Sequence, residues 1–211
     1  MSDFYAQVIE PVRQLEVELG LPSQFLERLE HEDDWSFVIK THALIEAAVT
    51  HALVVQTGLA SARDFFSRLE LSNSKTGKVA LAEAVDLLRS EERRFIRSLS
   101  ELRNVLVHDV KNVGIELRAY FAGLSKDKRK TFAASFCFVD FDKTDTAVPV
   151  EEALQRLSNE PKRAIWSTAI YIAALLQLQN DTARAKRLVL EYQMQVAKSS
   201  GAPNKTMEPT R

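Results

Sequence analysis

The chain has 211 residues, which is enough to bury one sizeable hydrophobic core. Apolar residues make up 45% of it and charged residues 27%, with only six glycines and six prolines, a composition typical of an ordinary soluble globular protein. The formal net charge of −1 argues against a broad, non-specific binder of polyanions, so any contact with nucleic acid must come from a local basic patch.

Helical patterns dominate the first part of the chain. Gly20 permits a left-handed cap and Pro22 cannot continue a helix, so together they close the first segment. Asp33 and Asp34 predict the cap of a long helix, which Gly58 stops. The expected helices before residue 90 cover 3–19, 23–31, 35–56, 60–69 and 75–88.

The next helix has a favourable start, because the hydroxyl of Ser90 can cap free amides and the acids Glu91 and Glu92 suit the positive helix end. We expect it to run to about Asn112, with Gly114 beyond it. Its apolar residues lie on one face, within about 60° of one another or slightly more. The residues expected to face the core are Phe95, Leu99, Leu102, Leu106, Val110 and Val113.

The opposite face of this helix carries an arginine, an amide and a histidine close together. With Phe95 at zero, Asn104 falls near about 180° and His108 near about 220°, while Arg103 is on the flank at about 80°. Such groups, with basic neighbours, could hold phosphates beside an imidazole. A solvated charged helix face is the alternative interpretation. The basic neighbours, which we take as candidate RNA-binding residues, are Arg93, Arg97 and Lys111.

The second half of the chain gives weaker signals. Residues 131–141 are rich in aromatic and β-tolerant side chains, and periodicity leaves helix or strand open there. Pro149 and Pro161 each sit where a first helical turn would place them. We expect one domain over 1–198 and a disordered tail over 199–211. The other expected helices cover 115–124, 150–158, 161–179 and 181–197.

Two features bear on the cellular compartment. Cys137, the single cysteine, cannot form an internal disulfide, which fits a reducing cytoplasm, and its apolar surroundings predict an unreactive thiol. Residues 164–180 carry no charge, yet the segment is at the short limit for spanning a bilayer and includes polar residues. We therefore expect a buried helix there, no membrane contact and a cytoplasmic protein.

The residues Arg103 and Asn104, three apolar residues and His108 resemble the signature of the HEPN superfamily. Residues 74–108 also look like the DUF4145 and mannitol operon repressor-like branch, where a lysine-containing helix, an acidic turn and a final "RN…H" helix follow in this order. Residues 43–46 resemble the preceding helix. The resemblance covers about residues 33–180 loosely and 74–108 more closely. It implies an all-α, HEPN-like helical bundle, with an antiparallel four-helix core and extra helices.

The resemblance also implies a function. In catalytic members, two such motifs meet across a homodimer and cleave RNA without a metal or another cofactor. His108 would act as general base or acid at the ribose 2′-hydroxyl, and Arg103 would stabilise the charge on the scissile phosphate. Asn104 would orient His108 or hydrogen-bond the phosphate. The expected products are a 2′,3′-cyclic phosphate and a 5′-hydroxyl.

Partners differ between the functions that this resemblance allows. Many such ribonucleases resemble toxins of toxin–antitoxin pairs, which implies a cognate antitoxin. Mannitol operon repressor-like members are instead regarded as regulators, so the alternative is a non-enzymatic regulatory or adaptor protein that binds another protein. The motif also has a purely structural interpretation, in which Arg103 pairs with acidic neighbours and His108 favours the negative helix end.

A metal site is the remaining candidate. His42 and Glu46 share a face of the long helix, but His51 lies about 180° from His42, so three ligands cannot converge there and we expect no metal. A buried Glu46 would need a partner of opposite charge, and Arg103 is a candidate for that salt bridge.

Overall fold

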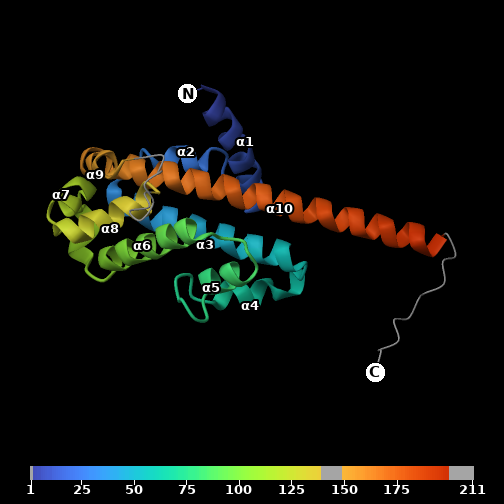
Figure 1. Ribbon diagram of the computed structural model, residues 1–211. Helices are drawn as coiled ribbons and strands as arrows, with labels where there is room; N and C mark the ends of the chain where they lie inside the picture. The colour runs from blue at the N-terminus through green and yellow to red at the C-terminus, as the bar shows by residue number, and fades with distance from the viewer. Residues whose placement is uncertain (1, 139–148, 200–211) are drawn as a thin grey trace.

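The computed structural model describes residues 2–138 and 149–199, and every element within these ranges is helical (Figure 1). This confirms the expected all-α class. The expected tail lies outside the described residues, except that Ser199 is the last residue of a helix. The helices are α1 (Ser2–Glu18), α2 (Phe25–Leu29), α3 (Asp34–Thr57), α4 (Arg63–Arg68), α5 (Lys78–Ala84), α6 (Ser90–Val107), α7 (Leu117–Ala122), α8 (Lys126–Phe136), α9 (Val150–Asn159) and α10 (Pro161–Ser199), with short 3₁₀ helices η1 (Ala60–Ala62) and η2 (Val110–Gly114).

Helix α3 begins and ends where the sequence predicts. The side chain of Asp33 accepts a hydrogen bond of 2.9 Å from the backbone N–H of Ser36, which caps the helix. At the other end Gly58 adopts φ 70°, a left-handed conformation that glycine takes without steric cost. Between these ends α3 is buried against α10, α6, α4 and α5, so it forms the centre of the fold.

Two neighbours run along α3 in opposite directions. Helix α6 is antiparallel to it, because Trp35 bonds the carbonyl of Leu106 and, further along, His42 contacts Ser100. Helix α10 is parallel to it: Lys162 pairs with Asp34 at 2.8 Å near one end, and the side chain of Gln56 bonds the Gln179 carbonyl near the other. Helix α10 then continues beyond the body of the protein (Figure 1).

Length and apolar composition make α3 the one helix in the described ranges that could cross a membrane. However, 67% of its most apolar window is buried inside the protein, as in the core helix of a globular fold. Residues 164–180, which the sequence predicts as a buried helix, lie in α10, where Ile165, Ile172 and Leu176 are fully buried.

An aromatic cluster decides between helix and strand for residues 131–138. Residues 131–136 belong to helix α8, which ends at Phe136, and residues 139–141 lie outside the described residues. Phe132 and Phe136 stand one turn apart with ring centroids 5.3 Å from each other, and both contact Phe121 edge-on. Cys137 follows, and burial raises its pKa to about 11, which keeps the thiol protonated and unreactive at neutral pH.

The predicted helix boundaries differ most from the structure in α6 and α10. The segments expected over 161–179 and 181–197 form the single helix α10, because the junction at Asn180 has no glycine or proline and the Asn180 side chain is buried. The helix expected to reach Asn112 ends at Val107, and Val110, expected in the core, is 82% exposed. Val113 is exposed as well.

We expect Phe95→Ala to lower the free energy of unfolding by about 3–5 kcal/mol, because Phe95 is fully buried and packs edge-on against Phe136. The matched control is Phe65→Ala, since Phe65 is 61% exposed and should change stability by about 0.5 kcal/mol or less. Urea unfolding followed by circular dichroism measures both. Equal losses in the two variants would contradict this placement of the core.

Candidate functional site

The Arg103–Asn104–His108 motif lies at the end of α6. Leu102 and Leu106 are fully buried, and this fixes the rotation of the last turn. Asn104 and His108 are exposed on the other side, and Arg103 is half-buried on the flank. The imidazole of His108 therefore lies outside the hydrophobic core, as the helical wheel predicts.

Arg103 and Asn104 contact each other directly. The Nη1 atom of Arg103 donates a hydrogen bond of 3.0 Å to Oδ1 of Asn104. The backbone N–H of His108 donates to the carbonyl of Asn104 at 3.2 Å, so His108 is the residue that closes the helix. The motif thus presents a guanidinium, an amide and an imidazole on one exposed helix end.

The helix stops at His108 because polar groups beyond it compete for the backbone. The side chain of Asp109 accepts a hydrogen bond of 2.9 Å from the N–H of Lys111 and begins the 3₁₀ turn η2. Asn112 then donates from Nδ2 to the carbonyl of Val105 at 2.8 Å, replacing the bond that a continued α-helix would make. These contacts account for the exposure of Val110 and Val113.

The three basic residues expected beside the motif differ in their surroundings. Arg93 is held by Glu83, with Nη2 2.8 Å from its Oε1, and by the carbonyl of Leu88. Arg97 is half-buried, with its Nε atom buried. Lys111 is exposed but lies in η2, beyond the end of the helix that was expected to carry it.

His42 forms a second polar site close to Arg103, which sequence reasoning weighed only as a metal ligand. Its Nε2 lies 3.1 Å from Oγ of Ser100, and that hydroxyl gives its proton to the Ile96 carbonyl. His42 must therefore donate from Nε2. Burial is the main reason that the pKa of His42 is lowered, with Glu46 opposing and the charge of Arg103 adding to the effect. In the sequence, the spacing of four residues between His42 and Glu46 was the signal that could have located this polar site.

Glu46 pairs with Lys78 of α5 and not with Arg103, the candidate partner in the sequence. The Nζ atom of Lys78 is 2.6 Å from Oε1 of Glu46 and 3.3 Å from the carbonyl of Ser67. Lys78 is 1% exposed, so its ammonium depends on these two acceptors. The pair joins α3 to α5 on the side of α3 that also carries His42.

A third polar cluster surrounds Glu18 at the end of α1. Arg184 of α10 donates two hydrogen bonds of 2.6 Å to its carboxylate, and Nε2 of His51 lies 2.7 Å from Oε2. The hydrogen bonds from Arg184 are the largest cause of a Glu18 pKa lowered to about 2, with His51 and Gln177 adding to them. His51 therefore serves this cluster, on a different side of α3 from His42.

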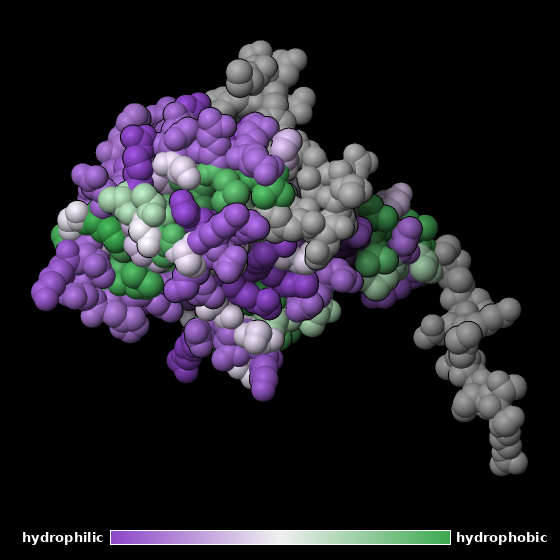
Figure 2. Space-filling model, turned by 60° about the vertical axis from the view of Figure 1, so that its left-hand side comes forward, coloured by the Kyte–Doolittle hydropathy of each residue, from purple (hydrophilic) through white to green (hydrophobic). Residues whose placement is uncertain are grey.

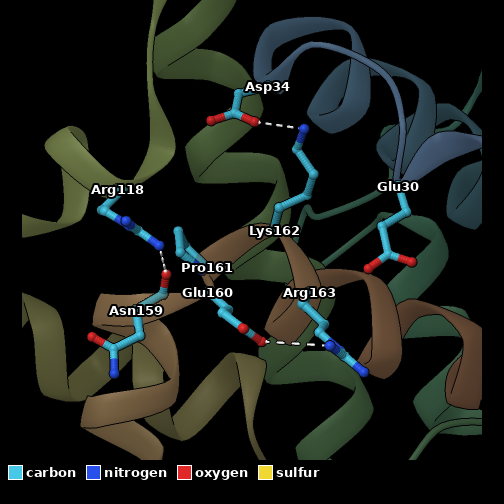
Figure 3. A pocket seen from close by; sticks show the side chains of 8 residues that line it. All are labelled: Glu30, Asp34, Arg118, Asn159, Glu160, Pro161, Lys162 and Arg163. Atoms are coloured by element: carbon cyan, nitrogen blue, oxygen red, sulfur yellow. Dashed lines mark hydrogen bonds and ion pairs between the residues drawn. The ribbon is translucent and has the colours of Figure 1, made fainter.

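Two of the surface hollows are lined by several charged side chains. One, of about 620 Å³, lies beside Glu18, Glu46 and Lys78, where Glu46 pairs with Lys78 and Glu18 with Arg184. The other, of about 340 Å³, lies at the start of α10, and Figure 3 shows two ion pairs in it, Asp34 with Lys162 and Glu160 with Arg163. Arg118 in this second hollow bonds the carbonyl of Asn159. Within the described residues, every cationic side chain that lines these two hollows has a hydrogen-bond or ion-pair partner.

Residues 2–138 and 149–199 contain no cluster of three or more histidine, cysteine, aspartate or glutamate side chains placed to hold a metal. No family, curated protein or solved structure was found to match this chain.

We expect Glu46→Gln to destabilise the protein by about 3 kcal/mol, because it leaves the buried ammonium of Lys78 without a counter-charge. Adding Lys78→Met should recover most of the loss, since the double variant buries no charge. Glu152→Gln is the matched control, because the Glu152–Arg156 pair is exposed and should contribute about 0.5 kcal/mol or less. Chemical unfolding measures all three, and an unrescued double variant would contradict the explanation.

The Glu18 cluster predicts a specific acid dependence of stability. Because the folded-state pKa of Glu18 is depressed, its contribution is fully present above about pH 4.5 and is lost as the pH falls towards about 2. Glu18→Gln should therefore lower stability at neutral pH and flatten the decline over this range. Unfolding curves at several pH values, with the exposed Glu10→Gln as control, measure it. A decline as steep in Glu18→Gln as in Glu10→Gln would refute the assignment.

Proposed function

We propose that this protein is a metal-independent endoribonuclease with a HEPN-like helical bundle, acting as a homodimer in the cytoplasm. Arg103, Asn104 and His108 from two copies would form its active site. The observation that carries the proposal is the exposed His108 imidazole, held at the end of α6 next to the hydrogen-bonded Arg103–Asn104 pair. A histidine with no core to fill and no described structural partner is free to take part in proton transfer.

The chemistry follows from what these groups can do. One His108 would accept the proton of a ribose 2′-hydroxyl, which attacks the adjacent phosphorus, and a second would protonate the leaving 5′-oxygen. Arg103 would bind the phosphate oxygens as charge develops on them, and Asn104, bonded to Arg103, would hold the guanidinium in position. The reaction gives a 2′,3′-cyclic phosphate and a 5′-hydroxyl, and it needs no metal ion.

A second candidate function is a non-enzymatic regulatory or adaptor protein of the same fold. The observation that favours it is the engagement of Arg93 by Glu83, which leaves fewer cations for phosphate near His108. On this proposal the exposed surface of the helices would bind a protein partner. For a toxin-like nuclease, the corresponding partner is a cognate antitoxin that covers His108.

We expect the purified protein to cleave single-stranded RNA in the presence of EDTA, and His108→Ala to reduce the rate by about 10²–10⁴-fold, the usual effect of losing a general acid or base. Arg103→Ala should cost about 10²–10³-fold through lost charge stabilisation. The matched control is His31→Ala, because His31 is an exposed histidine outside the motif.

The products provide a second check. Cleavage through the 2′-hydroxyl leaves cyclic phosphate ends and spares DNA of the same sequence, which mass spectrometry of short oligonucleotides detects. Folded wild-type protein that leaves RNA intact, or a His108→Ala variant as active as His31→Ala, would remove the nuclease proposal and leave the adaptor.

A further inference from the structure

The last part of α10 is a helical arm that extends beyond the body of the protein (Figure 1). Residues 188–199 are all exposed, including several large apolar side chains. Figure 2 shows apolar surface gathered on this projecting part of the helix. The arm therefore exposes apolar area that a single copy of the chain leaves in water.

One row of α10 residues, most of them apolar and exposed, follows an alternating spacing of three and four residues, while Leu188, Leu190 and Met194 lie outside it. This is the 3.5-residue repeat of a left-handed coiled coil, and it is sustained over more than three heptads. We call this row the seam. Its members are Leu175, Leu178, Thr182, Ala185, Val189, Tyr192, Val196 and Ser199.

The seam faces away from the body. On a helical wheel its members fall within about 60° of Val189, apart from the terminal Ser199, whereas Arg184 and Arg187 lie about 140° and 160° from it. Arg184 bonds Glu18 of α1, and the guanidinium of Arg187 lies close to Gly58 at the end of α3. The side of α10 that carries these two arginines therefore faces the body. The exposed fractions on the seam include 52% for Leu178, 55% for Val189, 67% for Tyr192 and 45% for Val196.

We propose that the seam pairs with the same seam of a second copy of this chain, as a parallel two-stranded coiled coil. The a positions of the repeat lie two turns apart, at Leu175, Thr182, Val189 and Val196, and the last three are β-branched. In parallel assemblies, β-branched residues at a combined with leucine at d, as at Leu178, favour two strands. An unrelated partner helix would have to match this pattern, whereas a second copy does so by symmetry.

The charges beside the seam fit the same arrangement. In a parallel pair, Asp181 at position g lies opposite Lys186 of the partner subunit at position e, an attractive contact repeated by symmetry. The described contacts of Asp181 all use Oδ1, which leaves Oδ2 for that lysine. The remaining flanking residues of the arm are uncharged, so no like charges oppose each other: Leu188, Gln193 and Gln195. Antiparallel pairing loses the Asp181–Lys186 contact.

This interface is separate from the proposed nuclease site. The His108 end of α6 lies near Trp35 at the start of α3, whereas the arm leaves the body beyond Gln56 at the end of α3. Pairing through the arms therefore joins two copies near the end of α3, whereas the motif of each copy lies near the start of α3. The arm proposal and the nuclease proposal can fail independently.

Oxidative crosslinking tests the pairing directly on the full chain with Cys137→Ser. Val189→Cys should form a disulfide-linked dimer, because identical a positions face each other in a parallel pair. The matched control is Leu190→Cys, which lies about 100° off the seam on the same exposed arm and should crosslink far more slowly. Equal crosslinking of the two variants overturns the proposal.

A second experiment measures mass in solution by light scattering after size-exclusion chromatography. Val189→Asp with Val196→Asp should halve the assembly mass of the wild type, because charges on the seam cannot be buried without partners. The control pair, Leu190→Asp with Met194→Asp, alters equally exposed residues off the seam and should keep the wild-type mass. Circular dichroism confirms that both fold. An unchanged mass in the seam variant over a dilution series in which the wild type dissociates, or an equal loss in the control, overturns the proposal.

Discussion

The packing of α6 against α3 determines where each polar group of the motif lies. The buried side chains of Leu102 and Leu106 hold one face of α6 in the core, so the opposite face is exposed to solvent. Hydrogen bonds from Trp35 to Leu106 and from His42 to Ser100 fix the register between the two helices. A shift of a single residue in this register would carry Asn104 and His108 towards the interior, where their polar groups would lose water.

Ion pairs between helices, with Lys78 fully buried and the other charged groups partly shielded from water, also organise the packing around α3. Glu46 and Lys78 tie α5 to one side of it, and Glu18 with Arg184 ties α1 and α10 to another. Such pairs add little net stability over apolar residues, but they penalise any packing that separates them. In this protein they specify which helices lie beside α3, where the apolar surface alone would accept several arrangements.

Local signals in the sequence were sufficient for both ends of α3, but not for every helix end or for contacts between helices. Asp33 and Gly58 mark the ends of α3 through their own hydrogen bonding and backbone freedom, so both could be predicted. The end of α6 could not be, because the side chains of Asp109 and Asn112 outweigh an apolar period that would have continued. The exposure of His108 was predictable from the helical wheel. The pairing of Glu46 with Lys78 depends on how α5 packs, which periodicity does not report.

The last turn of α6 is more firmly held than a helix end usually is. The carbonyls of Val105 and Leu106, which a terminal turn normally leaves to water, each accept a hydrogen bond from a side chain. Fraying at this end would break both bonds, so the backbone leading to His108 is restrained before any ligand arrives. A ligand that docks there meets a preordered surface and loses less of its affinity to the entropy of fixing the protein.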